Sequence, residues 1–319
     1  MGRAANAPHP TRHRVTISAE FLGLPARAPA AGREASVAER VRVALDRDLR
    51  AVVAHDPGTR SGADPEDLHQ MRVAVRRMRA VLRSARDTLD RDWADDTRAE
   101  LGWLGRALGP VRDLDVLVAH LRAESQDFAD EERAAVERLL DGLCAERRRA
   151  RERLLAVLAE ERYQALLHRL ADAATTGVPA SGHASDLMAV IRREYRALRD
   201  SVRRAHKDPT DQRLHAIRVR GKRLRYTLEL AEPALGKRGR RVLRALREMQ
   251  DVLGEHQDAH VAEERVRALL TPRDGDTPVP PEVAFVAGRL VERERRRREL
   301  ARARWPDVWA EVEHRAHDL

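Results

Sequence analysis

Two short segments of the sequence each carry five basic residues and no acidic residue. The first is HQMRVAVRRMRAVLR at residues 69–83, and the second is HAIRVRGKRLRYTL at residues 215–228. The chain has 61 Lys and Arg against 52 Asp and Glu, a net charge of +9, and outside these two segments the charges nearly cancel. Both segments therefore hold cations without acidic neighbours, which is typical of an anion-binding surface.

On a helix, at about 100° per residue, each segment separates into an apolar stripe and a basic stripe. The apolar stripes, which would face a core, comprise Leu68, Met71, Val75, Met78 and Leu82, and Leu214, Ile217, Leu224 and Leu228. The basic stripes comprise His69, Arg72, Arg76, Arg79 and Arg83, and His215, Arg218, Lys222 and Arg225. Arg77 and Arg223 lie beside the basic stripes, on the side away from the apolar ones, and would flank a groove.

The chemistry of these stripes suits a phosphate ligand. Like charges one helical turn apart destabilise a helix by about 0.2–0.5 kcal/mol per pair, so the row costs stability until an anion neutralises it. Arginine binds phosphate oxygens in two places and keeps its charge, and a histidine beside phosphate gains charge. A linear chain of phosphates could lie along such a helix, and its binding should strengthen below about pH 6.5 as histidines protonate.

Ion pairing with a neighbouring helix is the alternative explanation for the basic stripes. The acidic candidates for such pairs are Asp113, Asp115, Asp251 and Asp258. The occurrence of the same stripe twice in one chain favours anion binding.

The two segments also indicate an internal duplication. Placing His69 on His215 aligns the two stripes residue for residue. Further along, Leu108-Gly109 aligns with Leu253-Gly254, and Asp113 with Asp258. Matches in the same order at nearly the same separation predict a repeated unit.

The elements that would position the stripes are helices. Ala, Leu, Arg and Glu dominate the chain and aromatic residues are 3% of it, so we predict an all-α fold. Helices are expected at 36–55, 64–89, 95–124 and 128–170, and at 185–205, 211–230, 239–270 and 281–304. We predict two antiparallel four-helix bundles, divided as a disordered Ala/Pro/Arg tail at 1–33, a first half at 34–174, a linker at 175–184 and a second half at 185–319.

Composition excludes several classes of protein. Cys144 is the single cysteine, so an intramolecular disulfide is excluded. No run approaches the roughly 18 apolar residues of a membrane span, and the N-terminal region lacks the apolar core of a secretory signal. A cytoplasmic protein is the expectation.

The duplicated pattern His-x-hydrophobic-Arg-Val, then Arg/Lys-Arg-hydrophobic-Arg, then Leu-Gly and Asp resembles the CHAD family, the "conserved histidine α-helical domain". The matching residues are His69, Met71, Arg72, Val73, Arg76, Arg77, Met78 and Arg79, their counterparts His215, Ile217, Arg218, Val219, Lys222, Arg223, Leu224 and Arg225, and the stretch Leu108-Gly109 to Arg112-Asp113-Leu114-Asp115. The resemblance spans about residues 34 to 305. Three positions depart from the duplicated pattern, namely Lys222, Glu229 opposite Arg83, and His260 opposite Asp115.

The resemblance implies two four-helix bundles related by a pseudo-twofold, with a basic groove between them that binds inorganic polyphosphate. It also implies association with polyphosphate granules or with polyphosphate-metabolising enzymes. Family members are often fused to a triphosphate tunnel domain; no Glu-x-Glu-x-Lys strand lies near the start of this chain, and a stand-alone member is expected. We expect its groove to be lined by His69, Arg72, Arg76, Arg77, Arg79, Arg83, His215, Arg218, Lys222, Arg223 and Arg225.

General polyanion or nucleic-acid binding is the first rival hypothesis, because basic helices often contact nucleic-acid phosphates. Three Phe, three Tyr and four Trp leave little surface for stacking single strands, and only Tyr226 lies within a basic segment. No recognition-helix or zinc-finger pattern is visible. Nucleic acid is therefore the weaker alternative to polyphosphate.

A metal-dependent phosphohydrolase is the second rival. His256 and His260 have the one-turn spacing of two metal ligands on one helix face. However, Gln257 stands where a zincin has its general base, and a third ligand, a nucleophile elbow and a phosphate-binding loop are all missing from the sequence pattern. We therefore predict a binding protein without catalysis, cofactor or resident metal.

Overall fold

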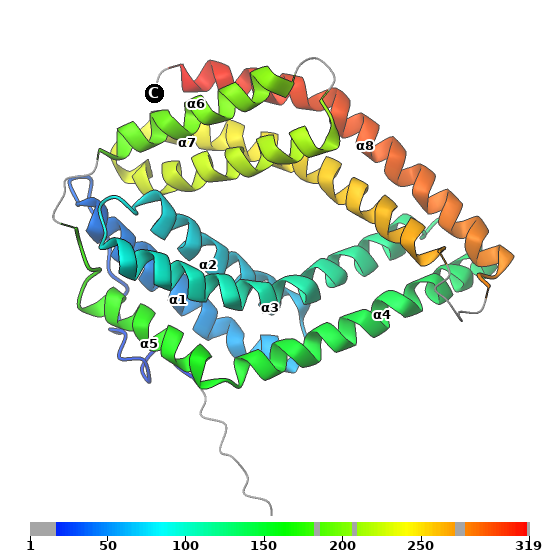
Figure 1. Ribbon diagram of the computed structural model, residues 1–319, viewed down its shortest axis with the longest axis horizontal. Coiled ribbons are helices and arrows are strands. Elements are labelled where there is room, and N and C mark those ends of the chain that lie inside the picture. The colour runs from blue at the N-terminus through cyan, green and yellow to red at the C-terminus, as the bar shows by residue number, and fades with distance from the viewer. Residues whose placement is uncertain (1–16, 182–185, 206–208, 272–277, 318–319) are drawn as a thin grey trace, which may run out of the picture.

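The structure of the protein, a computed structural model, describes residues 17–181, 186–205, 209–271 and 278–317. Within these residues the regular secondary structure is helical, apart from one isolated bridge between Leu89 and Ala180. The helices are α1 (Val37–Ser61), α2 (Pro65–Ser84), α3 (Arg91–Glu124), α4 (Asp130–Leu158), α5 (Glu161–Thr175), α6 (Leu187–Ala205), α7 (Asp211–Leu269) and α8 (Pro281–Ala316), as Figure 1 shows. The predicted all-α class is confirmed.

The first two helices begin where the sequence predicts. Ser36 Oγ accepts a hydrogen bond from the Glu39 N–H at 3.2 Å, and the Glu39 carboxylate accepts one from the Ser36 N–H at 2.7 Å. These two bonds form a capping box at the start of α1. At α2, Asp64 Oδ1 accepts from the Glu66 N–H at 2.8 Å, and Pro65 occupies the first helical position.

The first half contains five helices where the sequence predicts four. The expected helix at 128–170 is broken between α4 and α5 at Ala159 and Glu160, and Glu160 has an extended backbone. After the break, α5 packs on α1, where the buried Tyr163 hydroxyl donates to Asp56 Oδ1 at 2.9 Å. Because neither Gly nor Pro lies at the break, tertiary packing interrupts a sequence that is otherwise suited to one helix.

α7 is a helical hairpin. Gly236 has φ 59° and ψ −134°, a conformation that glycine adopts more readily than other residues, and it separates a first arm (residues 211–235) from a second arm (residues 237–269). The arms are antiparallel, since His215 Nδ1 lies 2.8 Å from Gln257 Oε1 and Gly221 packs against Met249. The two arms correspond to the helices expected at 211–230 and 239–270.

The segments that the sequence assigns to a tail and a linker contact the first half. Residues 17–33 belong to the predicted disordered tail, yet Ile17, Leu22 and Leu24 are buried in the core of the first half. Apolar side chains in this stretch explain that packing. Within the predicted linker at 175–184, the Asp90 N–H donates to the Pro179 carbonyl at 2.9 Å. Residues 1–16 and 182–185 lie outside the described residues.

α3 and α8 are long enough to join the two ends of the molecule. They have 34 and 36 residues, which at about 1.5 Å per residue gives roughly 50 Å. Figure 1 shows that α3 bends along its length, and Pro110 inside it lacks the N–H of a regular helical hydrogen bond. Far from α2, His120 of α3 meets α8, with its Nε2 atom 2.6 Å from Glu294 Oε1.

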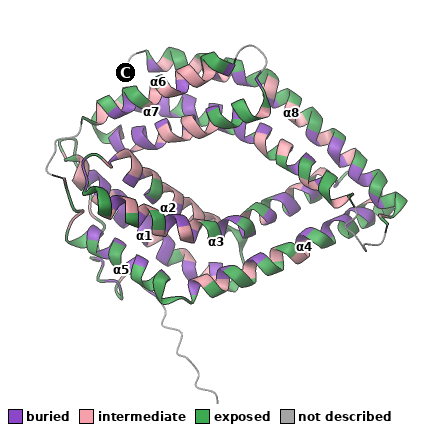
Figure 2. Cartoon of the chain, viewed as in Figure 1, coloured by how far each residue is buried: buried purple, intermediate pink, exposed green. Residues whose placement is uncertain are grey.

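The buried residues form two cores, and each helix carries buried and exposed positions side by side (Figure 2). The first core unites α1–α5 with the end of the second arm of α7 and with residues 283–291 of α8. The second core unites α6, most of α7 and residues 301–316 of α8. The boundary between the cores therefore crosses α7 and α8 rather than falling at residues 175–184.

Candidate anion-binding cleft

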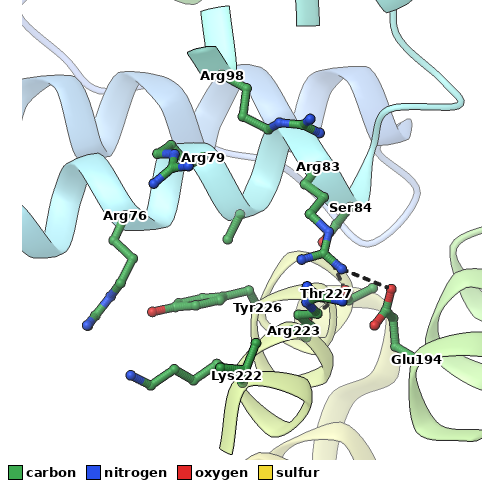
Figure 3. A pocket seen from close by; sticks show the side chains of 12 residues that line it. Arg76, Arg79, Arg83, Ser84, Arg98, Glu194, Lys222, Arg223, Tyr226 and Thr227 are labelled. Carbon is green, nitrogen blue, oxygen red and sulfur yellow. Dashed lines mark hydrogen bonds and ion pairs between the residues drawn. The ribbon is translucent and has the colours of Figure 1, made fainter. Parts of the chain in front are cut away.

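The basic stripes of α2 and of the first arm of α7 meet at a cleft of about 670 Å³ (Figure 3). Six basic residues and a single acidic one, Glu194, lie among the described residues of its wall. The basic residues are Arg76, Arg79 and Arg83 of α2, Arg98 of α3, and Lys222 and Arg223 of α7. This excess of positive charge makes the cleft the strongest candidate for an anion site in the described part of the chain.

α2 contributes three arginines whose guanidinium groups are crowded by other cations. Burial and the nearby Arg106 and Arg98 lower the pKa of Arg79. Burial and Arg223 lower the pKa of Arg83, although Glu194 lies 3.7 Å away and partly offsets them. A bound anion would relieve this repulsion.

α7 contributes a lysine with a strongly shifted titration. Burial, followed by the charges of Arg218 and Arg76, lowers the pKa of Lys222 to about 7. In Figure 3 the side chains of Arg76 and Lys222 come from opposite helices and point toward the same side of the cleft. Among the described residues, no carboxylate lies within ion-pair distance of Arg76, Arg79 or Lys222. The carboxylates nearby pair with other arginines of the two stripes.

Two arginines extend the stripes beyond the cleft wall, and each crosses a neighbouring helix at a glycine. A β-carbon on Gly109 would lie 2.7 Å from Arg72 Nη1, and one on Gly254 would lie 3.8 Å from Arg218 Nη2. Arg72 Nη2 also pairs with Asp113 Oδ1 at 3.1 Å. The Leu-Gly motifs of the sequence therefore provide room for guanidinium groups.

Several N–H groups of the basic residues are buried without an acceptor. Within the two basic segments, the Nε atoms of four arginines have no hydrogen-bond partner among the described residues, namely Arg76, Arg218, Arg223 and Arg225. Leaving a buried donor unpaired costs about 1–3 kcal/mol. Arg76 and Arg223 belong to the cleft wall, where a ligand that offers only acceptors, such as a phosphate chain, could satisfy such donors.

The structure places other predicted site residues away from the cleft wall. His69 is half-buried at the start of the stripe of α2, and burial and Arg112 lower its pKa. His215 is exposed and contacts Gln257. Arg225 lies 3.8 Å from Glu229 and its guanidinium stacks on Tyr226 at 4.8 Å from the ring centroid.

Arg77 does not flank the cleft. It lines a separate cavity of about 170 Å³ on the other side of Tyr226, close to the buried Asp48 of α1. The rotation that puts Arg76 into the cleft directs the next residue of α2 toward α1. The pattern of residues within one helix does not show where α1 packs. The predicted and observed positions of Arg77 differ for that reason.

The ion-pair alternative applies to part of the stripes. Asp113 pairs with Arg72, as that alternative expects, whereas Asp115 pairs with Arg147 of α4. Asp258 influences both Arg218 and Lys222, but burial raises its pKa, which weakens it as a counter-ion. The cleft itself retains a net positive wall.

Sequence reasoning missed the contributions of α3 and α6. Arg98, Arg106 and Arg112 of α3 influence the pKa values of the stripe of α2, and Glu194 comes from α6. Their signal in the sequence is the series of small residues at Gly102, Gly105 and Gly109, which face the arginines of α2. Because glycine has no β-carbon, glycines spaced at helical intervals leave room for long side chains of a neighbouring helix.

Two polar clusters are relevant to metal binding. His256 is buried, and it and His260 both lie near Asp211, at 3.2 Å and 3.6 Å. The described group with metal-ligand spacing is instead His120, Glu124 and Glu294. There the Arg297 guanidinium lies 3.1 Å from Glu294 and contacts His120, so a fixed positive charge occupies that position.

None of the described helices is both long enough and apolar enough to cross a membrane.

Comparison with known proteins identifies relatives of the chain. A family model described as CHAD domain matches residues 43–267. An uncharacterized protein of Mycobacterium tuberculosis (strain CDC 1551 / Oshkosh) is 30% identical over 241 residues, which cover 72% of this chain and 45% of that protein. A second uncharacterized protein, from the H37Rv strain, matches to the same extent. The chain thus spans about half the length of the curated relatives that it matches.

Two solved structures share the fold. The CHAD domain from the plant Ricinus communis superposes with a TM-score of 0.68 and 25% identity, over 91% of this chain and 96% of that one. PptA from Streptomyces chartreusis superposes with a TM-score of 0.67 over 88% of this chain and 100% of that one. The second pair is 23% identical in sequence, so that likeness concerns the fold alone.

Proposed function

This chain belongs to the CHAD domain family, and from that premise we propose that it binds inorganic polyphosphate, without catalysis, in the cleft between α2 and the first arm of α7. The observation that carries the proposal is the wall of six basic residues and one acidic residue. Polyphosphate is a linear polyanion that offers only oxygen acceptors along its length, and it therefore matches both the charge and the unpaired donors of the cleft.

The shape of the basic surface supports a chain-like ligand. Arg76 of α2 lies close enough to Arg218 and Lys222 of α7 to lower the pKa of both. A phosphate between the two helices would contact cations from both at once. Successive phosphates would continue along the stripe of α2 toward Arg72 in one direction and Arg83 in the other.

The parallel contacts of the two halves support the predicted internal duplication. Arg72 lies over Gly109 and beside Asp113, and Arg218 lies over Gly254 and near Asp258. A repeated unit of this kind would double the length of chain that the protein contacts. We further propose that the two halves are related by a pseudo-twofold and that each is a four-helix bundle in origin.

The side chains of the cleft favour binding over chemistry. Apart from Tyr226, the hydroxyl groups of its described wall belong to Ser84 and Thr227, which hydrogen-bond to each other at 2.9 Å. The imidazoles of His69 and His215 are not part of the described wall, so no histidine is available there to activate either hydroxyl. We propose that the protein organises or attaches to polyphosphate granules in the cytoplasm, together with polyphosphate-metabolising enzymes or granule proteins.

Charge reversal in both basic stripes, at Arg76 in the cleft wall and at Arg218 beyond it, tests the proposed function. The double substitution Arg76→Glu and Arg218→Glu should abolish the binding of long-chain polyphosphate, because it replaces two of the cations around the bound phosphate by anions. The helical circular dichroism and the melting temperature should change little. The matched control is Arg149→Glu with Arg153→Glu, on the exposed surface of α4.

The control carries the same change of net charge and should keep most of the affinity. Retained binding in the double variant of the cleft would contradict the assignment of the site. Equal loss of binding in both variants would mean that polyphosphate responds to the net charge of the protein rather than to the cleft.

A further inference from the structure

One neutral polar group in the cleft has no partner. The Tyr226 side chain is 5% exposed, and its hydroxyl oxygen is buried without a hydrogen-bond partner among the described residues. An unpaired buried hydroxyl costs about 1–3 kcal/mol relative to a paired one. Such a group in the wall of a cleft is a candidate for contact with a ligand.

The hydroxyl points into the basic part of the cleft. Figure 3 shows Tyr226 between Arg76 and Lys222, with its oxygen directed to the side where these two side chains end. Its proximity to Arg218 is sufficient to influence the pKa of that arginine. The Arg225 guanidinium stacks on the ring at 4.8 Å from the centroid and holds it in place.

No described residue accepts a hydrogen bond from this hydroxyl. Charged arginine and lysine side chains carry only donors. An acceptor that enters the cleft, such as a phosphate oxygen, would therefore give this donor a partner. Tyr163 provides the contrast within the same chain, because its fully buried hydroxyl donates to Asp56 Oδ1 at 2.9 Å.

We propose that the Tyr226 hydroxyl donates a hydrogen bond to a non-bridging oxygen of a phosphate that lies between Arg76, Arg218 and Lys222, and so determines how deeply the phosphate chain enters the cleft. This inference rests on the proposed function of the same site. A hydroxyl adds direction that arginine side chains alone do not impose, because it has one proton and a position fixed by its ring. It also adds affinity that does not depend on charge.

The test is Tyr226→Phe, which removes the hydroxyl and keeps the ring. The dissociation constant for long-chain polyphosphate should rise about tenfold, as expected for a hydrogen bond to a charged acceptor. The slope of affinity against salt concentration should not change, since no cation is lost. The melting temperature of the free protein should stay equal or rise, because an unpaired buried hydroxyl is removed.

The matched control is Tyr163→Phe, which removes a paired hydroxyl far from the cleft. It should lower the melting temperature and leave polyphosphate affinity unchanged when binding is measured well below that temperature. The two substitutions thus have opposite expected signatures in stability and in binding.

The outcomes separate this inference from the proposed function. If the unsubstituted protein does not bind polyphosphate, the proposed function fails. If it binds and Tyr226→Phe binds equally well, the hydroxyl does not contact the ligand and only the inference is overturned. A Tyr226→Phe protein that is less stable or unfolded would show that the hydroxyl has a structural partner, which also overturns it.

Discussion

Arginine and lysine have different roles among the cations of the cleft. The arginines keep their charge at all physiological pH values. Lys222 does not, because burial and the adjacent arginines Arg218 and Arg76 lower its pKa to about 7. It also stands where the first half has Arg76 in the aligned sequence. The position therefore gives the cleft a charge that depends on pH near neutrality.

This lysine changes the expected pH dependence of binding. The sequence suggested that histidine protonation strengthens binding below about pH 6.5. In the structure, burial and Arg112 lower the pKa of His69, so this ring protonates at lower pH than an ordinary histidine. In the described wall of the cleft, the side chain that titrates near neutral pH is Lys222.

We predict that polyphosphate affinity falls as the pH rises from about 7 to 9. Phosphate favours the charged amine and raises its pKa in the complex, so binding above pH 7 requires uptake of a proton. The loss is at most about tenfold per pH unit for one proton. Titrations at matched ionic strength across this range measure it.

The control for that prediction is Lys222→Arg, because arginine keeps its charge over the same pH range. The affinity of this variant for polyphosphate should therefore be nearly independent of pH. The unsubstituted protein without ligand should become more stable as the pH rises, whereas its affinity for polyphosphate falls. Between about 7 and the ordinary lysine value of 10.5 the unfolded chain binds the extra proton, so the free energy of unfolding rises with pH. An identical pH slope of binding in both proteins would contradict the role of Lys222.

The residues of the cleft could be predicted in part from the sequence. Helical periodicity correctly separated Arg76 and Arg79 from the buried Met71 and Met78. Periodicity describes one helix at a time, however, and the surroundings of a residue depend on its neighbours. The charge of Arg77 therefore acts on Asp48 of α1, an influence that no pattern within α2 indicates.

At the scale of elements, each basic stripe lies on one helix of a hairpin, α2 with α3 or the two arms of α7. In both hairpins the helices approach closely at glycines. α2 and α3 approach closely at Gly102 and Gly109, where arginine side chains cross. The two arms of α7 approach at Gly221, where a β-carbon would lie 2.6 Å from Met249 Cε. Local signals such as Ser36 and Asp64-Pro65 predicted where helices begin. The break before α5 has no local signal, because the contact of Tyr163 with α1 determines it.

Glycine substitutions test the hairpin of α7. Gly236→Ala should lower the free energy of unfolding by about 1–3 kcal/mol, because its φ of 59° and ψ of −134° are unfavourable for a residue with a β-carbon. Gly288→Ala, in an open part of α8, should raise it by about 0.5–1 kcal/mol through helix propensity. Urea unfolding with unchanged m-values measures both changes. A neutral Gly236→Ala would show that the turn does not depend on glycine.

At the scale of the whole molecule, the arrangement brings distant segments of the chain to one site. α2 and the first arm of α7 are far apart in sequence, and they meet because the two cores share α7 and α8. The repeated stripes predicted that two basic helices exist. The sequence could not show that α7 and α8 each contribute to both cores. The boundary between the cores therefore lies within these two helices and not at residues 175–184.

The whole cleft also explains why a phosphate chain should be preferred to nucleic acid. Its described wall is rich in cations on both sides and offers Tyr226 as its one aromatic residue, with a largely buried ring. Stacking of bases on aromatic side chains supplies much of the affinity for single strands. Polyphosphate needs no stacking surface and carries a higher density of charge.

The most direct test of the central claim is a competition titration with labelled long-chain polyphosphate at about 0.15 M salt. RNA, DNA and short phosphates serve as competitors at matched phosphate concentration. We predict that polyphosphate binds tightly and that neither nucleic acid displaces it at equal phosphate. Displacement by an equal phosphate concentration of RNA would contradict the claim and make the protein a general polyanion binder.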